Sequence, residues 1–154
     1  MAEEWDVEAL LPQRPPFLMV DRILELDPGR RAVTRRCVSR SDPVLTGHFP
    51  GYPIVPGVLL IETMAQTGAI AVAATGQKAT ALLAGVDHAR FRRQVRPGDV
   101  LTVEVELIKL GRRAGRGRGR ILADAEEVCS AEFLFVVQSL DAPPDPARAG
   151  TSDP

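Results

Sequence analysis

The apolar run 58–75 limits the possible folds of this chain more than any other feature. It has hydrophobic or small side chains on nearly every side, and Glu62 is its only charged residue. A helix that is hydrophobic all round has no face to give to water, so it must be buried. Glu62, Gln66 and the many alanines and threonines argue against a membrane span. We therefore expect one long buried helix over residues 57–75.

A proline-stiffened segment precedes this helix and contains one of the two histidines of the chain. Pro50, Pro53 and Pro56 each fix φ and remove a backbone donor, which excludes a helix or a central strand here. Such a rigid loop can hold His48 in one orientation. Taken alone, His48 would more often be a packing residue, and Glu62 alone could be a solvated residue near a helix end.

Glu62 and His48 together have the chemistry of an acid and a base. Glu62 lies near the helix start, where backbone N–H groups lack partners and the helix dipole is positive. Gln66 follows one turn later, within reach of the Glu62 carboxyl. A carboxyl in apolar surroundings tends to keep its proton, which suits a general acid, and an imidazole suits a general base. The N–H of Gly57 can hold a developing oxyanion, so the set fits proton abstraction beside a carbonyl with loss of a β-hydroxyl.

Strands are expected on both sides of the long helix. They cover residues 17–26, 31–39, 80–91, 101–107, 121–124 and 128–139, after a short helix over 6–11. Alternation of apolar and polar residues is clearest over 101–107, which indicates a half-buried strand. This order predicts an α+β fold in which a curved antiparallel sheet of about six strands wraps round one buried helix. Because the helix has no polar face, we expect dimerisation to complete its burial.

Composition and charge narrow the class of protein. Residues 1–140 are expected to form one domain, and the proline-rich tail 141–154 to be disordered. Cys37 and Cys129 fit no metal or redox spacing and are expected to fill strands as small apolar residues. The net charge of −1 gives no reason to expect nucleic acid or a membrane, and the acidic N-terminus is unlike a signal peptide. We expect a cytoplasmic protein without a metal or cofactor.

The stretch 47–66, GHFPGYPIVPGVLLIETMAQ, resembles the signature of the bacterial β-hydroxyacyl-(acyl carrier protein) dehydratases of type II fatty acid synthesis. Residues 11–22, LPQRPPFLMVDR, and 89–99, ARFRRQVRPGD, are similar to two further motifs of that family. The resemblance implies the hot-dog fold and a homodimer built through paired sheets, often assembled as a trimer of dimers. It also implies His48 and Glu62 as catalytic residues, with each site taking His48 from one subunit and Glu62 from the other.

The reaction implied by the resemblance is dehydration of (3R)-hydroxyacyl thioesters on acyl carrier protein to trans-2-enoyl thioesters in fatty acid biosynthesis. A related enzyme that also isomerises the double bond has Asp at the position of Glu62. The glutamate therefore favours a dehydratase without isomerase activity. Three alternatives stay open: a hot-dog thioesterase, a dehydratase of a specialised acyl or polyketide pathway, and a non-catalytic acyl-binding protein. A thioesterase has no evident use for His48 in this motif, and the intact His48 and Glu62 speak against the non-catalytic reading.

Several residues depart from the family or are not decided by the resemblance. Family members usually carry His and Tyr where this chain has Gln13 and Pro16, and an Asp-Gly turn where it reads DAEE at 124–127. Neither Gln13 nor Pro16 belongs to the catalytic pair, so we expect them to reshape the substrate tunnel rather than abolish activity. Tyr52, in the proline loop, is either a packing residue or part of the tunnel lining.

Five arginines crowd into the glycine-interleaved stretch 112–120: Arg112, Arg113, Arg116, Arg118 and Arg120. The stretch lacks the Lys-Ser/Thr of a phosphate loop and the aromatic side chains of an RNA-stacking surface. We interpret it as a loop, which is either solvated or binds an acidic partner. With help from Arg92 and Arg93, Arg112, Arg113 and Arg116 are expected to dock the acidic acyl carrier protein beside the tunnel mouth.

Overall fold

The structure is a computed structural model that describes residues 4–77 and 79–139. Its elements, in chain order, are α1 (Val7–Leu10), β1 (Arg22–Asp27), β2 (Arg31–Cys37), α2 (Pro43–Gly47), α3 (Gly57–Ala73), β3 (Ala79–Phe91), β4 (Val100–Leu110), β5 (Ala114–Ala123) and β6 (Glu126–Ser139). The strands form one antiparallel sheet in the order β1-β2-β4-β5-β6-β3. Two strands, the long helix and four strands follow one another as predicted. The tail 141–154 lies outside the described residues.

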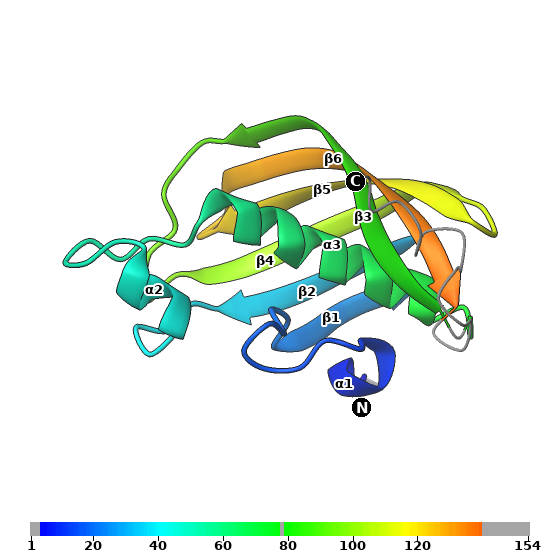
Figure 1. Ribbon diagram of the computed structural model, residues 1–154, viewed down its shortest axis with the longest axis horizontal. Helices are drawn as coiled ribbons and strands as arrows, with labels where there is room; N and C mark the ends of the chain where they lie inside the picture. The colour runs from blue at the N-terminus through cyan, green and yellow to red at the C-terminus, as the bar shows by residue number, and fades with distance from the viewer. Residues whose placement is uncertain (1–3, 78, 140–154) are drawn as a thin grey trace, which may run out of the picture.

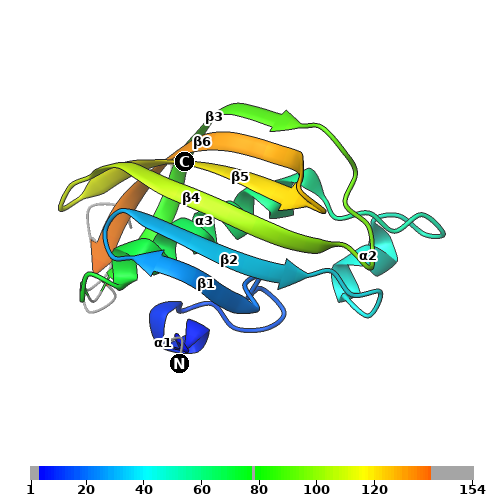
Figure 2. The same cartoon turned by 180° about the vertical axis from the view of Figure 1, so that it is seen from behind.

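Helix α3 lies across one face of the sheet, and the strands curve round it (Figure 1). Seen from behind, the other face of the sheet carries no helix of the described chain (Figure 2). The helix contacts β2, β3, β4, β5 and β6, so nearly the whole sheet takes part in its burial. This is the predicted arrangement of a curved antiparallel sheet of six strands round a single long helix. None of the helices in the described chain is long and apolar enough to cross a membrane.

The core lies between α3 and the side of the sheet that faces it. Met64 of α3 and Val103 of β4 are completely buried. One face of β6 is buried as well: Cys129, Ala131, Phe133 and Phe135 are buried, and Val137, expected on the same face, is partly buried. These side chains belong to one hydrophobic cluster. Burying a large apolar side chain stabilises a fold by roughly 1.5–3 kcal/mol, so this layer is what holds the sheet curved round the helix.

The prediction of a strand over 17–26 is wrong in its first half, because β1 begins only at Arg22. Further upstream, the backbone of Phe17 and Met19 bonds to a side chain of α3. The N–H of Met19 donates to Gln66 Oε1 at 2.8 Å, and the carbonyl of Phe17 accepts from Gln66 Nε2 at 2.8 Å. Periodicity along the chain cannot reveal such a partner, since Gln66 lies more than forty residues away.

The two cysteines have different environments, and only one was predicted correctly. Cys129 is buried in β6, whereas Cys37 is exposed. Cys37 is the last residue of β2, and its neighbours Arg36 and Val38 occupy the buried positions instead. Burial, with the nearby Glu127 carboxylate, raises the pKa of the Cys129 thiol to about 11.

One side of α3 is not covered by the sheet. Val58 is 72% exposed, and Glu62, Ala65 and Ala69 are only partly buried. These positions are three or four residues apart, so they lie along one side of the helix. The neighbouring edge strand β3 also exposes large apolar side chains: Leu82, Leu83, Val86 and Phe91. The sheet of one chain therefore leaves part of the helix open, as the sequence predicts.

Candidate active site

His48 directly follows the short helix α2 and is fixed by its own loop. Asp42 caps α2 by accepting a hydrogen bond from the N–H of Val44 at 3.1 Å. The Nδ1 atom of His48 lies 3.0 Å from the carbonyl oxygen of Ile54, and the Ile54 N–H donates to the His48 carbonyl at 3.0 Å. Because a carbonyl oxygen can only accept, this contact places the ring proton on Nδ1. The Nε2 lone pair is then free to take a proton from a substrate.

The tip of this loop is closed by two backbone hydrogen bonds. The N–H of Phe49 donates to the Tyr52 carbonyl at 2.9 Å, and the N–H of Tyr52 donates to the Phe49 carbonyl at 2.8 Å. The Phe49 ring also stacks on the His48 imidazole, with 4.0 Å between the ring centroids. At the far end of the loop, the Val55 N–H donates to the carbonyl of Val95 at 2.8 Å. The loop is therefore held in one shape, as its three prolines predict.

Glu62 is oriented by Gln66, one turn further along α3. The Gln66 Nε2 group donates to Glu62 Oε1 at 3.0 Å and also to the Phe17 carbonyl. Gln66 is only 1% exposed, and its Oε1 accepts from the N–H of Met19, so the whole amide is fixed. The predicted contact between Gln66 and Glu62 is confirmed. Glu62 itself stands on the uncovered side of the helix.

The start of α3 presents backbone donors beside a groove. Pro56 occupies the N-cap position without a side-chain cap, and no acceptor in the described chain bonds to the N–H of Gly57 or Val58. A Cβ atom on Gly57 would lie 2.9 Å from the Phe91 ring, so a larger residue here would require this half-exposed ring to shift. The groove beside it is lined by Ile54, Val55, Gly57, Leu60, Phe91, Arg92, Arg93, Gln94 and Val95. Free N–H groups at a helix start are well suited to hold a developing oxyanion.

A second groove lies near the other side of the helix start. It is lined by Pro16, Phe17, Leu18, Met19, Asp21, Arg36, Cys37, Asp42, Pro43, Val44 and Leu59. The buried Arg36 in its wall donates to Thr63 Oγ1 at 2.8 Å and pairs with Asp42 at 3.4 Å. Burial lowers the pKa of the Arg36 guanidinium, and the Asp42 carboxylate opposes that change. Pro16, where family members are expected to carry Tyr, therefore lies in the wall of this groove.

Two other departures have visible consequences. The Gln13 Oε1 atom is buried without a hydrogen-bond partner in the described chain. Between β5 and β6, Asp124 and Ala125 both have positive φ, 50° and 63°, which is the backbone of a two-residue hairpin. Ala125 therefore makes, at some conformational cost, a turn that usually takes glycine.

Within one chain, His48 and Glu62 are held by different hydrogen-bond partners. His48 is fixed by Ile54 in the loop, whereas Glu62 is fixed by Gln66 within α3. No hydrogen bond in the described chain joins the two side chains. The same residues contain no cluster of three or more His, Cys, Asp or Glu side chains that could hold a metal ion.

The prediction of a loop over 112–120 is wrong, because most of this stretch belongs to strand β5. Glycines and arginines alternate along the strand, so the glycines face α3 and the arginines face outward. A Cβ on Gly117 would lie 2.7 Å from the Phe133 ring, so glycine is required beneath the aromatic core. The outward arginines bind glutamates of adjacent strands: Arg116 pairs with Glu132, Arg118 with Glu106 and Arg120 with Glu104.

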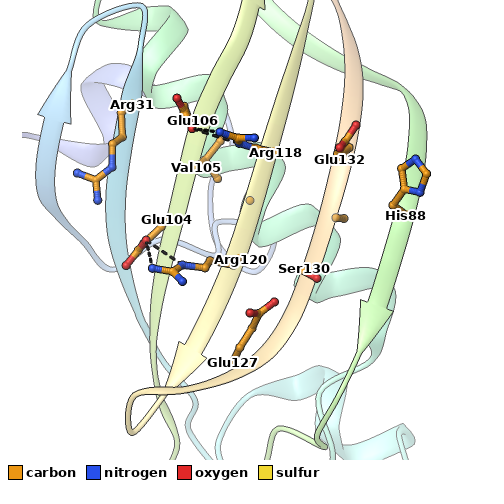
Figure 3. A pocket seen from close by; sticks show the side chains of 12 residues that line it. Arg31, His88, Glu104, Val105, Glu106, Arg118, Arg120, Glu127, Ser130 and Glu132 are labelled. Carbon is orange, nitrogen blue, oxygen red and sulfur yellow. Dashed lines mark hydrogen bonds and ion pairs between the residues drawn. The ribbon is translucent and has the colours of Figure 1, made fainter.

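This outward face forms a shallow groove of paired charges (Figure 3). We call the three cross-strand ion pairs of Arg116, Arg118 and Arg120 the arginine ladder. The Arg118–Glu106 and Arg120–Glu104 pairs are 2.9 and 3.0 Å long. Each arginine of the ladder has its charge neutralised by a glutamate. Arg116 is therefore no longer counted among the residues expected to bind an acidic partner.

The remaining predicted docking residues lie at opposite ends of the sheet. Arg92 and Arg93 follow β3 and bind Glu127 and Glu126 near the start of β6. Residues 112–113 form the hairpin at the other end of β5 (Figure 1). A strand of ten residues extends about 33 Å, so one chain does not combine these arginines into a single patch. Of these four arginines, Arg92 and Arg93 lie at the His48 end, and Arg112 and Arg113 lie at the other end.

Sequence reasoning did not find the residues that bind Tyr52. The Tyr52 hydroxyl donates to Gln94 Oε1 at 2.6 Å and accepts from Arg96 at 2.7 Å. Tyr52 is 45% exposed, and its hydroxyl is fixed by hydrogen bonds that neither of the two alternatives, packing residue or tunnel lining, anticipates. Tyr52 lies more than forty residues from Gln94 and Arg96, and no local pattern connects it to them.

A family model described as the FabA-like domain matches residues 11–132 of this chain. The chain is also similar to curated proteins named 3-hydroxyacyl-(acyl-carrier-protein) dehydratase FabZ. The protein of that name from Chloroflexus aggregans is 50% identical over 134 residues, which is 86% of this chain and 93% of the relative. The one from Pelotomaculum thermopropionicum is also 50% identical over 134 residues, which is 86% of this chain and 96% of the relative.

Solved structures show the same fold at low sequence identity. The dehydratase heterocomplex ApeI:P from Xenorhabdus doucetiae contains a chain that superposes with a TM-score of 0.78 at 20% identity, covering 90% of this chain and 94% of that one. The PaaI protein of Escherichia coli superposes with a TM-score of 0.60 at 21% identity, covering 74% of this chain and 80% of that one. These likenesses confirm the predicted hot-dog fold and carry no information about the substrate.

Proposed function

This chain belongs to the FabA-like family, and from that membership and the site geometry we propose that it dehydrates 3-hydroxyacyl groups carried on acyl carrier protein in fatty acid biosynthesis. The observation that carries the proposal is the fixed orientation of His48, whose Nδ1 is bound to the Ile54 carbonyl and whose Nε2 has no hydrogen-bond partner within the described residues. Half of the aligned residues are identical to those of curated relatives with this activity in their name. The expected product is the trans-2-enoyl thioester.

Each step of the reaction has a residue suited to it. His48 Nε2 removes the proton from the carbon next to the thioester carbonyl, and the electron pair forms the new carbon–carbon double bond. Glu62 gives a proton to the β-hydroxyl, which then leaves as water. The N–H groups of Gly57 and Val58 stabilise the negative charge that develops on the thioester oxygen. No electron acceptor is needed, because the elimination is redox-neutral.

A two-substrate assay tests the reaction class. The purified chain is incubated separately with a 3-hydroxyacyl thioester and with a saturated acyl thioester of the same length. We expect an absorbance increase from the conjugated enoyl product in the first mixture and no free thiol in either. Release of thiol from the saturated substrate would instead establish a thioesterase, and no change in either mixture would contradict catalysis by this chain.

We further propose that the active unit is a homodimer in which β3 pairs with β3 of a second copy. Edge strand β3 has a hydrogen-bonded neighbour, β6, on one side only among the described strands. Its exposed Leu82, Leu83 and Val86 continue the uncovered side of α3 that contains Glu62 and Val58. A long apolar edge strand is a template for pairing with another chain. A second copy would cover this surface and bring its own His48 loop toward Glu62.

Mixing two inactive variants tests the shared site. His48→Ala and Glu62→Gln proteins are combined under conditions that exchange subunits, and hybrid dimers are verified by mass. If each site takes His48 from one subunit and Glu62 from the other, a hybrid contains one intact site and regains part of the wild-type turnover. Verified hybrids without activity would mean that each chain builds its own site. A further association into a trimer of dimers is tested by the mass of the wild-type assembly.

The acyl carrier protein is proposed to bind at the His48 end of the sheet, where Arg92 and Arg93 lie beside the groove at Gly57. Arg112 and Arg113 of the same chain are too distant to join this contact, but a second copy paired antiparallel through β3 would bring its own hairpin toward this end.

We also propose a cytoplasmic location. Cys37 and Cys129 are both free thiols, and a reducing compartment keeps thiols in this state. Cell fractionation tests the location.

A further inference from the structure

Three side chains form a compact hydrogen-bonded group next to the His48 loop: Tyr52, Gln94 and Arg96. The Tyr52 hydroxyl donates to Gln94 Oε1 at 2.6 Å. Arg96 donates both to that hydroxyl at 2.7 Å and to Gln94 Oε1 at 3.0 Å. The Arg96 guanidinium also lies 5.0 Å from the centroid of the Tyr52 ring, within the range of a cation–π contact. Every pair in this group is in direct contact.

The group joins the tip of the His48 loop to a firmly anchored segment. Arg96 N–H donates to Asp99 Oδ2 at 2.9 Å, and Arg93 donates to the same carboxylate at 3.1 Å. On the loop side, the backbone of Tyr52 is closed onto Phe49, whose ring stacks on His48. Displacing the Tyr52 hydroxyl would therefore move the segment that carries His48. Figure 1 shows the two segments meeting at one end of the molecule.

We propose that Tyr52 is a positioning residue that clamps the His48 loop against residues 94–96 and so keeps His48 aimed at the substrate. The proposal rests on the catalytic role of His48 argued above. The loop tip needs such a link because Phe49 and Tyr52 are about half exposed and have little core to pack against. An exposed loop without side-chain links samples many conformations, and small displacements of a catalytic group cost rate.

The clamp also has a defined relation to the substrate groove. Gln94 and Ile54 both line the groove beside Gly57, and Ile54 is the residue that binds His48 Nδ1. Loosening the link would let the loop move relative to Gly57, whose N–H is the proposed oxyanion donor. The base and the oxyanion donor would then be held less well together. This predicts a loss in turnover and little change in substrate binding.

The test uses a short 3-hydroxyacyl thioester without carrier protein, so that docking does not enter the measurement. Tyr52→Phe removes only the hydroxyl and keeps the ring under Arg96. We expect kcat to fall about three- to tenfold, the scale of one net hydrogen bond, with KM and melting temperature close to wild type. Gln94→Leu, which removes the acceptor of the Tyr52 hydroxyl, should lower kcat by a similar factor.

A double-variant cycle separates the clamp from independent effects. Tyr52→Phe combined with Gln94→Leu should lose less than the two single losses combined, because both changes break the shared hydrogen bond between Tyr52 and Gln94. Arg96→Met should also lower kcat, and Arg22→Met, an exposed arginine at the start of β1, is its matched control. Wild-type kcat in Tyr52→Phe, additive losses, or a rise in KM alone would overturn the clamp. Wild-type turnover in His48→Ala would instead reject His48 as the base, which keeps the two failures distinct.

Discussion

Two groups of arginines, at 92–96 and at 116–120, are similar in density but are used differently by the fold. In the first group, the Arg93 guanidinium and the backbone N–H of Arg96 both bind the Asp99 carboxylate, and the Arg96 guanidinium donates to the Tyr52 hydroxyl. In the second group, each arginine crosses to a glutamate of a neighbouring strand. The first group links two segments beside the candidate site, whereas the second covers the outer face of the sheet (Figure 3).

The difference shows that the partners of a charge matter more than its density along the chain. Exposed ion pairs such as Arg118–Glu106 contribute roughly 0–1 kcal/mol each, because water screens them and the side chains lose freedom. Contacts that hold a loop beside a catalytic group affect geometry, and through it the rate. We therefore expect changes at the His48 end to alter catalysis and changes in the arginine ladder to have small effects.

The largest contrast is expected in turnover. His48→Ala removes the base and should lower kcat by about 10²–10⁴-fold, and Glu62→Gln should do the same by removing the proton donor. Arg118→Gln combined with Arg120→Gln, in the arginine ladder, should leave kcat close to wild type. Steady-state rates of enoyl formation, with circular dichroism as a folding control, measure all three proteins. A folded His48→Ala or Glu62→Gln variant with wild-type turnover would contradict that residue's role.

The two faces of β5 offer the next contrast, this time in stability. Gly117→Val places a side chain where the Phe133 ring already lies, and it should destabilise the fold by about 1–3 kcal/mol or prevent folding. Arg118→Val adds the same side chain to the outer face and should change stability by less than about 1 kcal/mol. Urea unfolding gives both values. Equal losses would mean that the arginine ladder supports the fold as much as the core does.

The docking of acyl carrier protein gives a smaller, salt-dependent contrast between the two ends of the sheet. Arg92→Glu should raise KM for carrier-bound substrate several-fold, and added salt should weaken the wild-type interaction, because such steering is electrostatic. KM for a short thioester without carrier should stay unchanged. The pair Arg112→Glu and Arg113→Glu has a comparable effect only if a second copy brings this hairpin to the site. Arg22→Glu is the charge-matched control, and an equal effect there would argue against a localised contact.

The smallest predicted effect concerns pH. Burial alone would raise the pKa of Asp99, but the Arg96 N–H and the Arg93 guanidinium hold it below its ordinary value. Such a carboxylate stabilises the fold fully above its unfolded pKa of about 3.9, and this contribution is lost as pH falls through the lower folded value. Asp99→Asn should therefore be about 1 kcal/mol less stable than wild type at neutral pH. Urea unfolding should show this difference shrinking below about pH 4, and a constant difference would contradict the linkage.

The sequence by itself determined the order of the elements and the chemistry of the candidate site. An all-apolar helix, prolines before it and alternation in β4 and β6 are local patterns, and local patterns report which face of an element is buried. The contact between Glu62 and Gln66 was predictable because one helical turn separates them. The family signature lies in one continuous stretch around His48, which is why a candidate site could be predicted without tertiary contacts.

Only the tertiary structure decided what β5, Tyr52 and the arginines do. The glycines of β5 predict a loop because glycine is depleted in strands. In the structure they leave room for the rings of Phe133 and Phe135, which lie on β6. The partners of Tyr52 come from a segment more than forty residues away, and the partner of Arg118 is set by the register between β4 and β5. Contacts between residues distant in sequence are set by the packing of whole elements, and periodicity along the chain does not record them.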